Sequence, residues 1–301
     1  MRELNFTVTK EYENTPLKHF LKSFVKLSTR TIQTLRNSED IVFINEKNAR
    51  IIDTVYEGDS IKIFIPETGA PPTLWDTPIT VIYEDEDLLA VNKPSGVSAH
   101  PTYNHPHETL SNAVASYIAK NDGNFSAVRS VGRLDKVTSG VMLFAKNSFV
   151  ASRLNGNMKK VYNALATGAM ENAGTVNAPI YRPDINKTER AVGKNGDKAI
   201  THWKALEQLN GATFLEITTE TGRTHQIRVH CAYIGHPLLG DVMYGAEETE
   251  NLKRSALHCS SITIIHPIKN TEITFTAPLP EDMKKELEKR KNIVDKQDNI
   301  C

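Results

Sequence analysis

The chain has 301 residues, of which 39% are hydrophobic and 24% are charged, and its 36 basic residues balance its 36 acidic ones. These values are typical of a globular protein of one or two domains, and they give no sign of a low-complexity chain. No apolar run approaches the roughly 18 residues of a membrane span, and the beginning of the chain lacks the apolar core of a signal peptide.

The cysteines indicate the compartment. Cys231, Cys259 and Cys301 are an odd number, and none of them forms a Cys-x-x-Cys pair. This pattern argues against a disulfide framework and for a reducing environment. We therefore expect a cytoplasmic protein with no membrane association, and by default a monomer.

The first predicted unit covers residues 13–66. Apolar residues at helical spacing predict a helix over TPLKHFLKSFVKL, and Ser28 is placed to cap a second helix, TRTIQTLRN. Two β-type runs follow, DIVFIN and DSIKIFIPE, the second entered through the turn EGD. This helix-helix-strand unit carries basic residues on its exposed helical positions, among them Lys18, Arg30 and Arg36.

We expect a linker at residues 67–78, because the stretch PETGAPPTLWDTP (66–78) contains four prolines and one glycine. Residues 79–292 predict a longer α+β unit, and residues 293–301 a short tail. Helices are expected at TLSNAVASYIAKN, THQIRVHCAYIG and PEDMKKELEKRKN. Strands are expected at ITVIYED, LLAVNKP, GVMLFAK, KVYNALATG, AITHWKALEQL, ATFLEITTE, LHCSSITIIHP and EITFTAP. Many strands with few helices between them favour a mixed, mainly antiparallel sheet with flanking helices and a central cleft.

The segment VGRLDKVTSG contains a single carboxylate, Asp135, two residues after Arg133. A lone Asp before a Thr-Ser-Gly turn is ordinarily a cap or turn residue, and Arg133 by itself an ordinary surface charge. From residue 136 to residue 170 the chain carries five basic residues and no acidic one. This excess is compatible with a solvated surface and with a strip that follows phosphates.

The segment TGRTHQIRVHCAYIG raises the question of what partner its arginine has. Arg228 lies between two apolar positions, and a buried arginine needs an acid, either a nearby Glu or Asp135. On a helix Gln226, Arg228 and His230 cannot all face one way, so we expect some of them to point away from the core. The histidines and the cysteine of this stretch fit no structural zinc spacing, and we expect no metal.

Two further residues are ambiguous when taken alone. Tyr162 in KVYNALATG is either a half-buried sheet tyrosine or a ring on which a base stacks. His100 lies in a loop with His105 and His107, and clustered histidines usually line a polar loop.

Taken together, GRLDKVTSGVMLFAK, KVYNALATG, TGRTHQIRVHCAYIGHPLLGDVMYG and LHCSSITIIHP resemble the RluA-type pseudouridine synthases in order and spacing, over residues 79–283. Residues 16–66 resemble the alpha-L RNA-binding module of the ribosomal protein S-four type. The resemblance implies that a uridine in RNA is converted to its carbon-linked isomer without a cofactor. We expect the RNA to be ribosomal or transfer RNA, and the module favours ribosomal RNA.

The resemblance also implies roles for four residues. Asp135 falls on the essential aspartate of the family, and Arg228 on the basic residue that pairs with it. Tyr162 matches the tyrosine that packs on the flipped base, and Arg133 the arginine that helps to displace the target nucleotide. The expected RNA contacts are Arg133, Arg223, His100, Lys18, Arg30 and Arg36.

One position departs from the family. RluA-type enzymes commonly have His before Arg-Leu-Asp, where this chain has Gly132, as the related RsuA-type synthases do. Two other functions remain open from the residues: a non-catalytic RNA-binding protein, and a glycosylase that releases free uracil.

Overall fold

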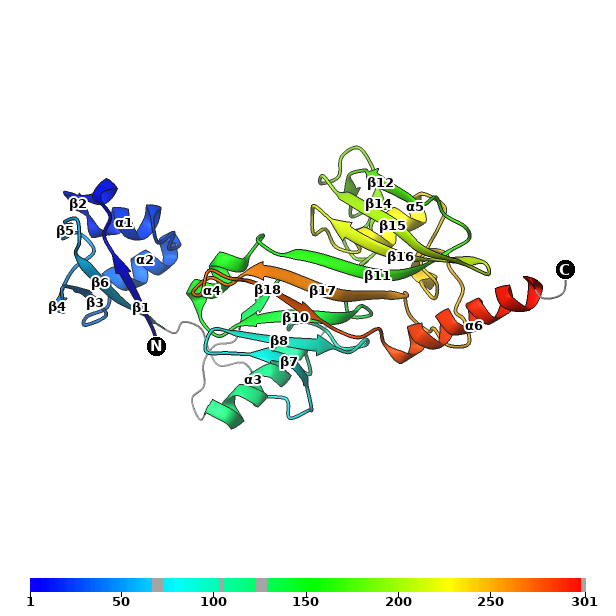
Figure 1. Ribbon diagram of the computed structural model, residues 1–301, viewed down its shortest axis with the longest axis horizontal. Helices are drawn as coiled ribbons and strands as arrows, with labels where there is room; N and C mark the ends of the chain where they lie inside the picture. Colours follow the sequence, from blue (N-terminus) through cyan, green and yellow to red (C-terminus); the bar gives the residue numbers. More distant parts are fainter. Residues whose placement is uncertain (67–72, 103–105, 123–128, 299–301) are drawn as a thin grey trace.

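The computed structural model describes residues 1–66, 73–102, 106–122 and 129–298, with their side chains except those of Asp122 and of the residues after Lys291. Figure 1 shows a small N-terminal unit and a larger unit built on one long sheet. Part of the predicted linker (67–72) and His105 lie outside the described residues, and residues 73–79 form no helix or strand. None of the helices in the described ranges is long and apolar enough to span a bilayer.

The N-terminal unit contains both predicted helices, α1 (Leu17–Ser23) and α2 (Thr29–Arg36). Ser28 caps α2 as predicted, because its Oγ accepts a hydrogen bond of 3.0 Å from the amide of Thr31. The helices pack on a four-stranded sheet in the order β1 (Arg2–Thr7), β6 (Ser60–Ile65), β3 (Val42–Ile44) and β4 (Lys47–Asn48). A short 3-10 turn (Lys10–Tyr12) and the paired strands β2 (Thr15–Pro16) and β5 (Thr54–Val55) complete the unit.

Strand β1 is a feature that the sequence reading missed. It pairs antiparallel with β6 along its whole length, from Arg2 opposite Ile65 to Thr7 opposite Ser60. The sheet of the N-terminal unit therefore begins before residue 13. Side chains buried beneath it include Leu17, Phe20 and Leu21 of α1, which are fully buried.

The large unit is built on the mixed, mainly antiparallel sheet that the sequence predicts. Its main path has eight strands: β12 (Ala173–Asn177), β15 (Ile200–Leu209), β16 (Ala212–Thr219), β11 (Lys159–Thr167), β17 (Leu257–Ile265), β10 (Ser139–Ala145), β8 (Leu88–Lys93) and β7 (Thr80–Glu84). Two more strands join its sides, β18 (Glu272–Thr276) on β17 and β9 (Arg129–Val131) on β10. A separate two-stranded ribbon pairs β13 (Ile180–Tyr181) with β14 (Ala191–Val192).

The centre of the sheet is a short parallel contact between β10 and β17, where Ser139 lies opposite His258 and Gly140 opposite Cys259. Gly140 has φ +116°, and a Cβ there would lie 2.1 Å from the carbonyl oxygen of Cys259. Only glycine permits this approach. Gly140 therefore allows the two halves of the sheet to meet five residues after Asp135.

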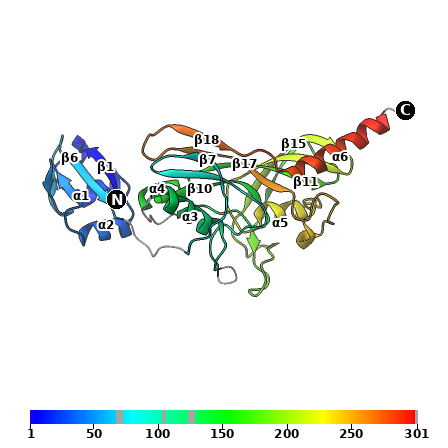
Figure 2. The ribbon, with the colours of Figure 1, turned by 90° about the horizontal axis from the view of Figure 1, so that it is seen from below.

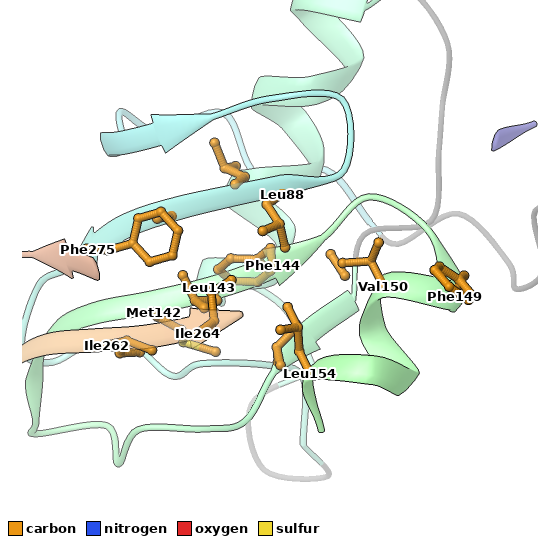
Figure 3. Close-up of a cluster of buried hydrophobic side chains, with 14 of the residues drawn as sticks. Leu88, Met142, Leu143, Phe144, Phe149, Val150, Leu154, Ile262, Ile264 and Phe275 are labelled. Carbon is orange, nitrogen blue, oxygen red and sulfur yellow. The ribbon is translucent and has the colours of Figure 1, made fainter. Parts of the chain in front are cut away.

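Four helices accompany the sheet: α3 (Leu110–Asp122), α4 (Ser148–Leu154), α5 (Gln226–Tyr233) and α6 (Glu281–Asp298). Figure 2 shows α3 and α4 on the same side of the β7–β8–β10 region. The close-up in Figure 3 shows side chains of β10 and β17 packing with those of α4, among them Phe144, Ile264 and Leu154. Helix α6 continues into the segment from residue 293 and ends at Asp298.

Candidate active site

Asp135 lies in the loop between β9 and β10, where its carbonyl accepts a hydrogen bond of 3.0 Å from the amide of Thr138. Its side chain is 17% exposed. Arg133 is the nearest cation, with Nη2 3.8 Å from Asp135 Oδ1, and it is half exposed. Asp135 is therefore a turn residue, as the motif alone suggests, and its carboxylate also lies beside an arginine.

Two buried cations hold the loop that carries Asp135. The amino group of Lys93, at the end of β8, donates to the carbonyls of Pro94, Lys136 and Thr138 at 2.9, 3.1 and 2.7 Å. Three acceptors match the three hydrogens of an ammonium group, although burial lowers the pKa of Lys93 to about 7. Lys93 was not predicted as a site residue, because the sequence shows only one lysine at the end of an apolar strand.

Arg254 is the second of these cations. It donates to the carbonyl of Val137 at 3.3 Å and makes a bidentate ion pair with Asp282 of α6, at 2.7 and 3.0 Å. The carbonyls of residues 136, 137 and 138 are therefore all bound by buried cationic side chains, and α6 is connected to the loop through Arg254.

A cavity of about 320 Å³ opens beside this loop. Its walls include Asp135, Arg133, Tyr162, Arg223 and Arg228, so the structure brings five of the predicted site residues together. Tyr162 lies on β11 and is 8% exposed. Burial, with the nearby charge of Asp135, raises the pKa of its phenol well above the usual value, so the hydroxyl keeps its proton at neutral pH.

The predicted direct pairing of Arg228 with Asp135 is wrong. The guanidinium of Arg228 makes a bidentate ion pair with Asp241, with both N–O distances at 2.6 Å, and it stacks on Tyr244 with Cζ 4.9 Å from the ring centre. Asp241 follows α5 by a short connection, so the pair forms within one stretch of chain. Burial disfavours the charged form of Arg228, but Asp241 raises its pKa above the ordinary value.

The expectation that some polar side chains of α5 point away from the core is also wrong. Gln226, Arg228 and His230 are all buried, at 5%, 5% and 0% exposure. Gln226 donates to the carbonyl of Ile200 at 2.9 Å, and His230 lies between Thr201 Oγ1 and the carbonyl of Ala178, each at 2.9 Å. The helix is enclosed on several sides, and each polar group has a partner there.

A second cavity, of about 460 Å³, lies on another side of Asp135. His100 and Arg190 are among its walls, and His225 lines both cavities. Nδ1 of His100 is buried and has no hydrogen-bond partner among the residues that the structure describes, and burial lowers the pKa of this histidine. His225 was missed from the sequence; its Nδ1 lies 2.8 Å from the hydroxyl of Tyr244, and its φ is +57°.

Three of the predicted RNA contacts, Lys18, Arg30 and Arg36, line neither cavity. Arg223 lines the first one and pairs with Asp197 at 3.2 Å. Lys18, Arg30 and Arg36 are exposed on α1 and α2 of the N-terminal unit.

One group of metal-type donors lies close together within the described residues, namely Asp85, Asp87 and His266. Asp85 accepts from Lys269 and Asp87 from Arg2, so protein donors already occupy these carboxylates. This group does not line either cavity beside Asp135.

Comparisons with known proteins identify the family of this chain. The family model described as RNA pseudouridylate synthase matches residues 87–233. YjbO of Bacillus subtilis (strain 168), an uncharacterized RNA pseudouridine synthase, is 38% identical over 267 residues, which cover 86% of this chain and 94% of the relative. The chain belongs to the RNA pseudouridine synthase family. The synthase therefore isomerises uridine in RNA, and the RluA-type assignment made from the sequence is confirmed.

Other matches bear on the fold and on the full length. YlyB of the same bacterium, also an uncharacterized RNA pseudouridine synthase, is 34% identical over 97% of this synthase and 100% of its own length. The ribosomal large subunit pseudouridine synthase D of Salmonella typhimurium is 37% identical over 69% of each chain. The human RNA pseudouridylate synthase domain containing 4 shares the fold, with a TM-score of 0.57 and 23% identity over 69% of this synthase and 92% of that chain.

Proposed function

We propose that this synthase modifies a uridine of large-subunit ribosomal RNA and that Asp135 is its catalytic carboxylate. The observation that carries the proposal is the cavity that joins Asp135, Arg133 and Tyr162. Its second acid, Glu220, is half exposed and pairs with His202 at 2.9 Å, which leaves Asp135 as the enclosed carboxylate.

The chemistry of the reaction matches a site of this kind. A base within an RNA helix must leave the stack before it reacts, at a cost of a few kcal/mol. Stacking on an aromatic ring returns roughly 1–3 kcal/mol, and Tyr162 supplies that ring. In this proposal Arg133, which is half exposed beside the loop, occupies the position that the uridine leaves.

One enclosed carboxylate also suits an isomerisation better than a hydrolysis. Hydrolysis of a glycosidic bond commonly uses two carboxylates and a water molecule. In the isomerisation the bond between C1′ of the ribose and N1 breaks and a bond between C1′ and C5 forms. The hydrogen of C5 passes to solvent, and N1 takes up a proton in its place. The guanidinium of Arg133 lies 3.8 Å from the carboxylate of Asp135.

The choice of ribosomal RNA has two supports. Several relatives between 32% and 38% identical are ribosomal large subunit pseudouridine synthases D. The N-terminal unit, which we propose is an alpha-L RNA-binding module, presents Lys18, Arg30 and Arg36 to solvent. Such cations contact phosphates without reading the sequence of the RNA.

The test uses unmodified transcripts of large-subunit ribosomal RNA and of transfer RNAs, labelled with tritium at C5 of uridine. Each isomerisation releases one tritium to water. Asp135→Asn should slow the release by roughly 10²–10⁴-fold, while the matched acid-to-amide change Glu171→Gln, at an exposed turn, should leave it unchanged. Turnover of Asp135→Asn near the parent rate would overturn the catalytic assignment. Turnover on transfer RNA alone would overturn the choice of substrate.

A further inference from the structure

Lys160 lies on β11 two residues before Tyr162, and both line the cavity beside Asp135. Because side chains alternate along a strand, the two share one face and lie roughly 6.6 Å apart along it. In the sequence, Lys160 is one of the five basic residues between residues 136 and 170. The structure separates it from its neighbour Lys159, which is exposed.

The amino group of Lys160 lies against the backbone of Gly132. A Cβ at residue 132 would be 3.0 Å from Lys160 Nζ and 3.0 Å from Met158 Cε. Gly132 also has φ +73°, a conformation that favours glycine. The residue that departs from the common RluA-type pattern is therefore the one that leaves room for this amino group directly before Arg133.

Lys160 differs from the other cations of the cavity in having no acidic partner. Arg133 lies beside Asp135, Arg223 pairs with Asp197, and Arg228 pairs with Asp241. Lys160 makes no ion pair or side-chain hydrogen bond with any residue that the structure describes. It is half-buried, and burial lowers its pKa. A charge in this setting carries a desolvation cost that an incoming anion would offset.

We propose that Lys160 binds one of the two phosphodiester groups that flank the target nucleotide in the RNA. This inference rests on the proposed function, in which the base packs on Tyr162. The anionic groups of RNA are its phosphates, and they lie beyond the sugar from the base. Lys160 precedes the base-stacking Tyr162 by two residues on the same strand. Its amino group is therefore within reach of the sugar-phosphate backbone of the bound nucleotide. Arg133, next to Gly132, adds a second cation at the same edge of the cavity.

The test compares Lys160→Gln with Lys159→Gln, which removes the same charge from the neighbouring position. Turnover is measured by tritium release from C5-labelled large-subunit ribosomal RNA transcript, and affinity by filter binding of the same transcript. One charged hydrogen bond to phosphate makes a difference of about tenfold or more. We expect Lys160→Gln to raise KM and Kd by about that factor and to change kcat little, and Lys160→Arg to recover most of the loss. Lys159→Gln should stay within about twofold.

Two further measurements identify the phosphate. The dependence of log K on log salt should become shallower by about 0.7 for Lys160→Gln, the value for one single-strand contact. RNA with a neutral methylphosphonate linkage on each side of the target uridine should bind the parent and Lys160→Gln equally. A persistent difference on this neutral RNA, or equal effects of Lys160→Gln and Lys159→Gln, would overturn the inference.

The outcomes separate this inference from the proposed function. Parent enzyme that turns over the transcript while both lysine variants behave alike removes the role of Lys160 and leaves the function intact. Parent enzyme that binds the transcript through Lys160 without releasing tritium removes the proposed substrate and leaves the phosphate contact intact.

Discussion

Replacing Asp241 by asparagine tests the electrostatic arrangement around Arg228. The change keeps the size of the side chain and removes the negative charge that both guanidinium nitrogens contact at 2.6 Å. The side chains of Arg228 and Asp241 are only 6% and 1% exposed, so water cannot replace the lost partner. The arginine is then left buried with an amide oxygen as its nearest acceptor.

The magnitude follows from the distance and the burial. Two unit charges about 4 Å apart attract by about 4 kcal/mol at an effective dielectric constant of about 20. Breaking a buried pair by removing one partner costs roughly 3–5 kcal/mol. We expect Asp241→Asn to lower the free energy of unfolding by that amount. Asp135→Asn, whose partner Arg133 is half exposed at 3.8 Å, should lower it by no more than about 1 kcal/mol.

The assay is urea unfolding followed by tryptophan fluorescence. The two tryptophans, Trp75 and Trp203, both lie outside the N-terminal unit, so the signal reports the unit that holds the site. A double variant, Asp241→Leu with Arg228→Met, should recover much of the loss because no unpaired charge remains. A loss below about 1 kcal/mol for Asp241→Asn, with more than about 3 kcal/mol for Asp135→Asn, would show that Arg228 pairs with Asp135 after all.

Two other predictions concern the acid side of the pH range and the link to α6. Burial would raise the pKa of Asp85, but hydrogen bonds from Lys269, Tyr83 and two backbone amides hold it well below the usual value, so its stabilisation is full above about pH 4 and is lost as the pH falls. Thermal unfolding between pH 3 and pH 7 should therefore show a weaker acid dependence in Asp85→Asn than in the parent, and equal slopes would contradict this. Arg254→Met removes the donor to the carbonyl of residue 137 and leaves Asp282 without its partner; it should cost about 3 kcal/mol of unfolding free energy and lower kcat more than KM. An unchanged kcat in the folded variant would show that the loop does not depend on Arg254.

The sequence predicts those parts of the fold whose signal is local. Residue types predict strands at β7 and β8, which the structure contains as an antiparallel pair. The apolar run after Gly140 predicts β10, and all seven of its residues are buried. Ser28 predicts the start of α2, because a cap acts within three residues of the helix end.

Features that depend on distant segments could not be read in the same way. β1 is a strand because β6, more than fifty residues later, pairs with it. The face that a residue of α5 presents could not be predicted from periodicity, since segments on several sides enclose the helix and supply partners for Gln226 and His230.

The sequence predicted which residues line the candidate site better than it predicted which of them contact each other. Asp135, Tyr162 and Arg228 do share one cavity, and the motifs named them by resemblance. Residue types and spacing did not show that Asp241 would pair with Arg228, because they do not determine which acid of the chain meets the arginine in the fold. Lys93 and Lys160 were missed because a lysine has the same appearance in a sequence whether its amino group is buried or solvated.

The three consecutive carbonyls that Lys93 and Arg254 hold fix the position of the loop before any RNA arrives. In the proposed reaction the enzyme therefore contributes a rigid template, and the conformational work falls on the nucleic acid. Transcripts whose target uridine already sits in an open or weakly paired region would reach the carboxylate at a lower energetic cost than those in a perfect duplex.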